Sequence, residues 1–274
     1  MKKEYRDQFY QTFDETLAQD GFVRRYQAYW KIDFAENWYI CLWPKSDTQG
    51  YVFDVQLDIG CVSELDADEC RNMHRSRSRK TLSRLDQDDH GPVFKLWSMP
   101  DYFPHALEVY KKYVSQLFRS INSLYDIYLL DRKLSSDMVT LSDERYVDML
   151  LFLGKYTEAQ QVANEMRKWI DFLNKELLTY EQSVRSKLAE YYALPESIKK
   201  IVAHIIKSWE SGIDNLPRQR ENILSLEEKV NMLIDSLTFD NCDKKREELI
   251  KRAESNKEAL RKLFSAKEIA IMNK

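Results

Sequence analysis

The spacing of hydrophobic residues changes from helical to strand-like and back to helical along the chain. Near the start, large apolar side chains recur at every fourth position: Tyr5, Phe9, Phe13 and Leu17. This period predicts an amphipathic helix over residues 3–20. Gly21 follows Asp20 and suits the left-handed conformation with which many helices end.

Alternating apolar and polar residues then predict a β-sheet. The alternating segments are 26–34, 38–43 and 51–59. Short polar links between them predict an antiparallel meander with one buried face. A fourth strand is predicted at 93–97. Pro104 fits the first turn of a helix, which we expect to run to residue 132. These elements make up a predicted α+β domain, residues 1–132.

Beyond residue 132 the strand pattern stops and the helical period returns. Two helices are predicted within 142–193, with a break at Gly154. One apolar stripe follows: Ile198, Ile201, Val202, Ile205, Ile206 and Trp209. A second set steps by alternating threes and fours, as in a coiled-coil seam: Ile223, Leu226, Val230, Leu233 and Leu237. The pattern therefore predicts an all-helical domain of antiparallel hairpins over residues 133–274.

Composition agrees with a helix-rich chain and excludes several classes. Only 6 glycines and 6 prolines occur among 274 residues, which counts against turn-dense β-barrels and glycine-rich phosphate loops. The 42 Lys and Arg and 45 Asp and Glu give a net charge of -3. A protein that coats nucleic acid normally has a strongly basic balance, so any phosphate contact must come from a local patch.

The sequence also bears on location and partners. The first ten residues lack the apolar region of a signal peptide, and the longest aliphatic run, residues 149–153, is too short to cross a bilayer. We expect a cytoplasmic protein with no membrane partner. The four cysteines, at 41, 61, 70 and 242, show no CxxC pairing and are interpreted as reduced thiols. In an oxidising compartment they could pair.

The usual catalytic motifs are absent. The sequence contains no GxGxxG, GxxxxGK[ST], HExxH or GxSxG. Its four histidines, at 74, 90, 105 and 204, are scattered, and none is paired with a nucleophile by spacing. No catalytic residue and no cofactor are expected. An enzyme with an unrecognised site around Asp54, Asp58, Arg75 and His90 remains an alternative.

Two groups of residues are candidate metal ligands. Asp54 and Asp58, with Asp33 on the neighbouring strand, could form an acidic cluster on one sheet face. Strand acids exposed to solvent are the commoner arrangement. The set Cys61, Cys70, His74 and His90 matches no compact zinc spacing, so buried thiols and loop histidines explain it better. No metal is expected.

A basic segment is the most unusual stretch of the chain. Residues 71–84 carry six cations and no acid: Arg71, Arg75, Arg77, Arg79, Lys80 and Arg84. Arginine forks suit phosphate and carboxylate groups, so one interpretation is a polyanion-binding site that makes the chain a nucleic-acid-binding accessory factor. The alternative is a solvated segment whose cations pair with acids just downstream, at 86, 88 and 89.

Aromatic residues on the nominally polar sheet face are a second candidate surface. These residues are Tyr29, Tyr39 and Trp43, which alternate with the inward-facing apolar residues of their strands. Such large rings are expected to be shielded from water by another part of the protein or by a partner. Either the C-terminal helices pack on them, which is the commoner fate of large rings, or they form a partner-binding groove.

The N-terminal part resembles a bacterial domain-of-unknown-function family (the 4304 type). The resemblance rests on four segments: Asp20-Gly21-Phe22, Tyr29-Trp30, Trp38-Tyr39-Ile40-Cys41-Leu42-Trp43 before Pro44-Lys45-Ser46, and Phe53-Asp54-Val55-Gln56-Leu57-Asp58-Ile59-Gly60. It covers less than half of the chain and implies an α+β fold and a bacterial source. Residues 146–163 are also similar to one helical hairpin of the tetratricopeptide type, but we find no second copy.

These observations favour a non-enzymatic bacterial interaction protein. We expect helix seams and aromatic or arginine anchors to contact a protein partner, for example a second copy of the chain. The family-like N-terminus suggests a toxin-immunity or phage-defence cassette as the biological setting.

Overall fold

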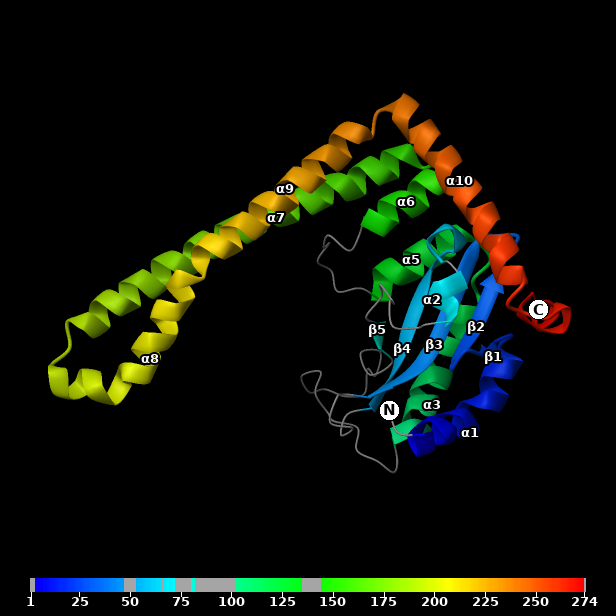
Figure 1. Ribbon diagram of the computed structural model, residues 1–274, viewed down its shortest axis with the longest axis horizontal. Helices are drawn as coiled ribbons and strands as arrows, with labels where there is room; N and C mark the ends of the chain where they lie inside the picture. Colours follow the sequence, from blue (N-terminus) through cyan, green and yellow to red (C-terminus); the bar gives the residue numbers. More distant parts are fainter. Residues whose placement is uncertain are drawn as a thin grey trace. The chain divides into compact units, whose positions relative to one another are not determined.

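The computed structural model describes residues 3–46, 53–65, 67–71, 80–81, 102–134 and 144–273 (Figure 1). The fold is α+β, as the pattern predicts: an antiparallel meander with flanking helices is followed by long helices. Contacts divide the chain into two compact units. The sheet unit takes the described parts of Met1–Asp137, Asp148–Gly154 and Asp243–Lys274. The helical unit takes those of Met138–Val147 and Lys155–Cys242.

The sheet has the strand order β1-β2-β3-β4-β5, and every neighbouring pair is antiparallel. The strands are β1 (Val23–Arg25), β2 (Ala28–Asp33), β3 (Trp38–Ser46), β4 (Phe53–Cys61) and β5 (Lys80–Thr81). Tyr26 and Gln27, predicted as strand, instead form a two-residue turn with φ of 49° and 68°. Positive φ at both positions is what a type I′ hairpin turn requires. The predicted strand at 93–97 lies outside the described residues.

One sheet face packs against helices from the N-terminal part. These are α1 (Lys3–Gln19) and α3 (Tyr102–Val109). The Phe9 ring of α1 lies 5.6 Å from Tyr29 of β2 and 5.5 Å from Phe103 of α3, centroid to centroid. Phe13 and Leu17 are also buried, so the predicted every-fourth-residue stripe is the inner face of α1.

The other sheet face is covered by the C-terminal end of the chain. Trp30, Cys41 and their neighbours share a core with Leu260, Leu263, Phe264 and Met272. These four come from α10 (Phe239–Arg261), α11 (Ala266–Met272) and the link between them. Asn256 of α10 also donates to the Val62 carbonyl, at 3.0 Å. Both faces are therefore buried, where the sequence pattern predicted one, and the predicted division after residue 132 separates residues of a single core.

The helix predicted over 104–132 is divided. After α3 come a π-helical turn, η3 (Tyr110–Val114), then α4 (Ser115–Arg119) and α5 (Leu124–Leu134). The side chains of Ser123 and Asp126 explain the restart: Ser123 Oγ accepts from the Asp126 amide at 3.2 Å, and Asp126 Oδ2 accepts from Ser123 Oγ at 2.9 Å. This reciprocal capping starts a new helix after the interruption at 120–123.

Long helices make up the helical unit. Beyond α6 (Glu144–Phe152) they are α7 (Tyr156–Tyr192), α8 (Glu196–Asp214) and α9 (Leu216–Ser236). Helices α7 and α9 lie side by side, and the seam between them buries Met166, Ile170, Ile223 and Val230 (Figure 1). Across it, Glu181 of α7 is paired with Arg220 of α9 and with Arg185 one turn on. Within the described residues, the remaining short helices are η1 (Val62–Glu64) and α2 (Ala67–Arg71).

Candidate functional site

Two of the six cations of the basic segment 71–84 lie within the described residues. Arg71 lies at the end of α2, where its Nη1 is 3.1 Å from Oδ1 of Asp68. Lys80 lies in β5, opposite Leu57 of β4. The other four cations, Arg75, Arg77, Arg79 and Arg84, lie outside the described residues. Polyanion binding by this segment stays a prediction.

The three aromatic residues of the predicted partner surface are buried. Tyr29, Tyr39 and Trp43 expose 2%, 4% and 8% of their surface. They do not share one face as expected. Tyr29 pairs with Leu42, so it faces α1, whereas Tyr39 and Trp43 belong to the core formed with the C-terminal helices. Their rings thus contribute to two cores and present no exposed surface for a partner.

The hydroxyls of these tyrosines are bonded to acids. Tyr29 Oη donates to Asp14 Oδ1 at 2.6 Å, and Tyr39 Oη donates to Asp58 Oδ2 at 3.3 Å. Burial and the hydrogen bond to Asp14 raise the pKa of Tyr29 far above its ordinary value. The Tyr29 hydroxyl is therefore not prepared to act as a base or nucleophile near neutral pH.

The proposed acidic cluster does not form. Asp58 pairs with Cys41, which pairs with Trp30, so Asp58 faces the C-terminal helices. Asp33 pairs with Trp38, three register positions away from this set and on the opposite face. Asp33 Oδ1 instead accepts from the amides of the following loop, Ala35 and Glu36, both at 2.9 Å. Within the described residues, no three His, Cys, Asp or Glu side chains are grouped to hold a metal ion.

All four cysteines are free and buried. Burial raises the pKa of the Cys61 thiol to about 12, and burial together with Asp58 raises that of Cys41 well above its ordinary value. Thiolates, the reactive form, are therefore suppressed at both positions. His74 and His90, the other members of the candidate zinc set, lie outside the described residues.

A buried polar network centred on Asp20 was not predicted. Asp20 ends α1 and is 3% exposed. Its Oδ2 accepts from Tyr110 Oη at 2.6 Å and Ser115 Oγ at 2.7 Å, and its Oδ1 accepts from Arg119 Nε at 2.7 Å. Lys31 of β2 donates to the Asp20 carbonyl at 2.9 Å. One sequence signal pointed here: an acid at a helix C-terminus opposes the helix dipole and so needs cationic partners elsewhere.

The π-helical turn makes the Asp20 network possible. Tyr110 and Ser115 are five residues apart, and the i to i+5 spacing of η3 brings both hydroxyls onto one carboxylate. Burial alone would raise the pKa of Asp20, but the bonds from Tyr110, Ser115 and Arg119 outweigh it and lower that pKa. With both oxygens bonded, the carboxylate fastens α1 to η3 and α4.

A shallow hollow of about 660 Å³ lies between α1 and the β1–β2 turn. Three arginines line it, but they are engaged. Arg24 Nη1 is 2.9 Å from Asp14 Oδ2, and its guanidinium lies 4.6 Å from the centre of the Tyr10 ring. Arg6 donates to Gln27 at 2.8 Å, and Arg25 is paired with Glu268 of α11. The hollow therefore offers no set of unpaired cations converging on one point.

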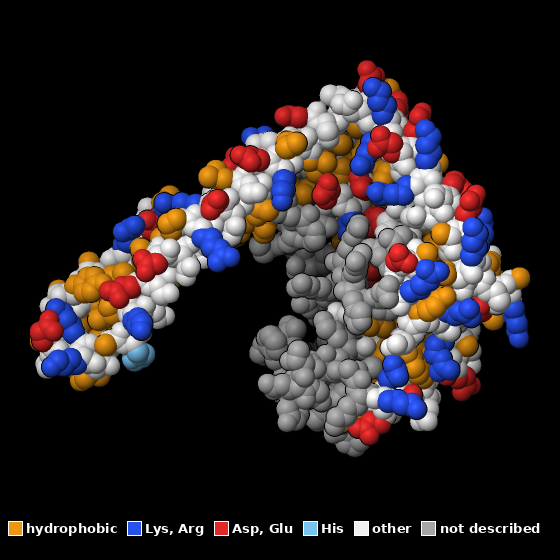
Figure 2. Space-filling model, in the orientation of Figure 1, with side chains coloured by type: hydrophobic (Ala, Val, Ile, Leu, Met, Phe, Trp, Pro, Cys, Tyr) orange, Lys and Arg blue, Asp and Glu red, His pale blue; other side chains and the backbone are white. Residues whose placement is uncertain are grey.

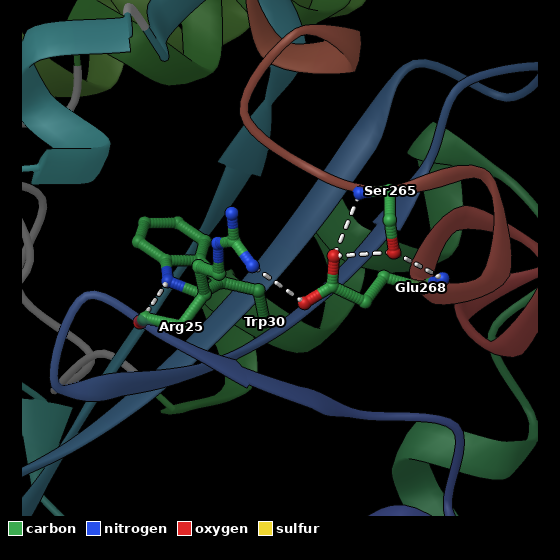
Figure 3. A network of polar contacts seen from close by, with 4 residues as sticks. All are labelled: Arg25, Trp30, Ser265 and Glu268. Atoms are coloured by element: carbon green, nitrogen blue, oxygen red, sulfur yellow. Dashed lines mark hydrogen bonds and ion pairs between the residues drawn. The ribbon is translucent and has the colours of Figure 1, made fainter.

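The pairing of Arg25 with Glu268 belongs to a small network that attaches α11 to the sheet (Figure 3). Arg25 Nη1 donates to Glu268 Oε1 at 3.2 Å, and Trp30 Nε1 donates to the Arg25 carbonyl at 3.2 Å. Ser265 and Glu268 form a capping box at the start of α11. Burial would raise the pKa of Glu268, but the bonds from Ser265 and Arg25 lower it. The network is structural.

The clearest surface feature is apolar and lies on the helical unit. Nine of the ten exposed large hydrophobic residues in the described part of the chain belong to it: Phe172, Leu178, Tyr180, Tyr192, Ile198, Ile201, Leu224, Met232 and Phe239. The tenth is Leu129 of α5. Figure 2 shows hydrophobic side chains gathered on the surface at the α7–α8 end of this unit. Of the described helices, none is long and apolar enough to cross a membrane.

Comparison with protein-family models, with curated proteins and with solved structures finds no match. The resemblances noted in the sequence therefore stay expectations.

Proposed function

We propose that this chain is a non-enzymatic protein-interaction module whose partner packs along α7 and α9. The observation that carries the proposal is the distribution of exposed apolar side chains. Seven of the ten in the described part of the chain lie on α7, on α9 and at the first residue of α10. Exposed hydrophobic residues scattered singly are ordinary, whereas their concentration on one part of a molecule is typical of an interaction surface.

The construction of the helical unit supports the same proposal. One cluster along the seam between α7 and α9 buries Met166, Ile170, Ile223 and Val230. Six more are only partly covered along its edges: Trp169, Leu173, Leu177, Leu226, Leu233 and Ile234. A pair of helices can bury only the side chains between them, and a further helical layer is the usual way to cover the rest. An amphipathic helix or helical hairpin is therefore the partner that fits.

A second copy of this chain is the first partner to test, because its own α7–α9 hairpin is such a layer. Four-helix bundles form when two hairpins pack on each other in this way. The free, buried cysteines support a cytoplasmic setting, where thiols stay reduced.

Light scattering coupled to size-exclusion chromatography tests this proposal. We expect the wild type to elute as a dimer at micromolar concentration, and the double variant Leu224→Ser/Met232→Ser, whose two side chains expose 58% and 72% of their surface, to shift towards monomer. Leu129→Ser is the matched control, since Leu129 is exposed to 49% but lies on the sheet unit. A strict monomer in every case would rule out self-association and leave only a different protein as partner.

A further inference from the structure

Helix α8 is strongly amphipathic but unburied. Its apolar stripe, Ile198, Ile201, Val202, Ile205, Ile206 and Trp209, recurs at helical spacing. Not one residue of this 19-residue helix is buried, and Ile201 exposes 74% of its surface. Most helices gain their stability by packing such a stripe on a neighbour, and the later part of this stripe, from Val202 to Trp209, is partly buried. Its first part, at Ile198 and Ile201, is exposed and has a surface still to cover.

Helix α8 is attached to α7 through its second half. The Trp209 ring meets Tyr191 edge to face, with centroids 5.0 Å apart. Tyr192 Oη donates to Glu210. At Gly212, a Cβ would lie only 2.5 Å from the Tyr180 hydroxyl, so the absence of a side chain allows this close approach. Ile198 and Ile201, both exposed, lie in the first half of the helix, away from these contacts.

The polar side of α8 is uniformly basic over the same stretch. Residues 198–209 contain Lys199, Lys200 and Lys207, with His204, and no Asp or Glu. At 3.6 residues per turn, Lys200 and Lys207 lie opposite the stripe and Lys199 lies on its border. The nearest acids lie just outside the segment. Glu196 precedes it and is paired with Lys199 at 2.9 Å, and Glu210 follows it.

From this arrangement we infer that residues 198–209 of α8 dock on the surface of an anionic lipid bilayer. A helix with isoleucines on one face and lysines on the other has the composition of helices that lie in the membrane interface. The isoleucines enter the acyl boundary, and the lysines are attracted by the negative surface potential of the headgroups. A neutral protein groove would cover the stripe but would not attract the lysines.

This inference goes beyond the proposed function and uses different residues. It also revises the expectation of no membrane partner, which considered only segments that span a bilayer. A helix that lies in the interface needs amphipathicity and not the length or overall hydrophobicity of a spanning segment. A peripheral contact is compatible with the finding that no described helix is able to span the membrane.

Vesicle co-sedimentation of the full chain tests the inference. We expect binding to vesicles of mixed phosphatidylglycerol and phosphatidylcholine, weakened by added salt, and little binding to pure phosphatidylcholine. The variant Lys199→Gln/Lys200→Gln/Lys207→Gln should bind about a hundredfold more weakly, since each lysine near an anionic surface contributes roughly fivefold. Replacing the two most exposed isoleucines, Ile198→Ser/Ile201→Ser, should weaken binding by about tenfold or more.

Matched controls remove the same kinds of side chain elsewhere on the molecule. Lys168→Gln/Lys175→Gln/Lys229→Gln removes three exposed lysines of α7 and α9, and Leu129→Ser removes an exposed apolar residue of α5 that lies outside the proposed interaction surface. Both should bind vesicles within about twofold of wild type. Far-ultraviolet circular dichroism checks that each variant keeps its helices.

Three results would overturn the inference. They are no sedimentation of the wild type with anionic vesicles, equal sedimentation with neutral ones, or equal loss in the control variants. If the α8 isoleucine variant instead changes only the oligomeric state, the stripe belongs to a second copy and not to lipid. The proposed function is tested separately by the α9 variant, so either idea can fail while the other stands.

Discussion

Asp20 shows how much one buried carboxylate contributes to the sheet unit. Its oxygens receive three hydrogen bonds, from Tyr110, Ser115 and Arg119, and its side chain is fully shielded from solvent. Asp20→Asn keeps the shape but leaves Arg119 without its anion. We expect a loss of about 2–3 kcal/mol in the free energy of unfolding, measured by urea denaturation. A loss comparable with that of an exposed substitution, such as Asp68→Asn, would contradict this role.

The same residue gives the stability a predictable pH dependence. The pKa of Asp20 is lower in the folded chain than the ordinary value of 3.8. Its contribution is therefore complete above that ordinary value and is lost as the pH falls through the lower, folded value. The melting temperature of the wild type should drop more steeply below about pH 4 than that of Asp20→Asn. Parallel curves for the two proteins would show that Asp20 is not the group responsible.

Thiol chemistry offers a second check at the residue scale. All four cysteines are buried, and the pKa of Cys61 is raised to about 12. Ellman's reagent should label none of the four quickly in the native protein and all four in guanidinium chloride. Rapid labelling of even one thiol before denaturation would mean that the sheet unit or the start of α10 opens more readily than this structure implies.

Among the elements, the β1–β2 hairpin is held in an unfavourable turn. Tyr26 and Gln27 both have positive φ, which ordinary side chains adopt at a cost and which glycine adopts freely. Gln27→Gly should therefore stabilise the chain by about 0.5–1 kcal/mol, even though it removes the exposed hydrogen bond from Arg6. Thermal denaturation measures the change. A destabilised variant would show that the Arg6–Gln27 bond outweighs the backbone strain.

The elements also show which parts of the fold are readable from sequence. Helix α1 and the α9 seam follow from the spacing of Phe9, Phe13 and Leu17 and of Ile223 and Val230, because local periodicity records which side is buried. The β1–β2 turn was missed because Tyr26-Gln27 lacks the Asn or Gly that normally marks such a turn. The break before α5 had a local signal, Ser123 and Asp126, which the longer apolar pattern obscured.

At the scale of the whole molecule, the C-terminal residues pack on the N-terminal sheet, although the whole helical unit separates the two in the sequence. Leu260, Leu263, Phe264 and Met272 complete the core around Trp30 and Cys41. A fragment of residues 1–132, the predicted α+β domain, lacks all four and should fail to fold cooperatively. Thermal denaturation followed by near-ultraviolet circular dichroism tests this. A fragment that melts as sharply as the full chain would contradict the shared core.

Such long-range assembly explains the limits of the sequence analysis for the candidate sites. Grouping Tyr29 with Tyr39, or Asp33 with Asp58, required the register between β2 and β3, which alternation within each strand does not determine. Asp20 and Tyr110 are 90 residues apart, and the strands of the sheet lie between them in the sequence, so local periodicity does not reveal their contact. The α8 stripe, by contrast, was visible from the start, but only the structure shows that its first part, at Ile198 and Ile201, stays exposed while the rest is partly buried.

Photo-crosslinking from the helical unit tests the central claim most directly. A photoreactive amino acid replaces Leu178, Leu224 or Met232, or, as controls, the exposed polar residues Lys175 and Lys229 of the same helices. The purified chain or a lysate of its host is then irradiated. An interaction module predicts one discrete adduct, with a second copy or with a single other protein, from the apolar positions and not from the controls. Equal, diffuse labelling from both sets would contradict the claim that this apolar surface is where the protein acts.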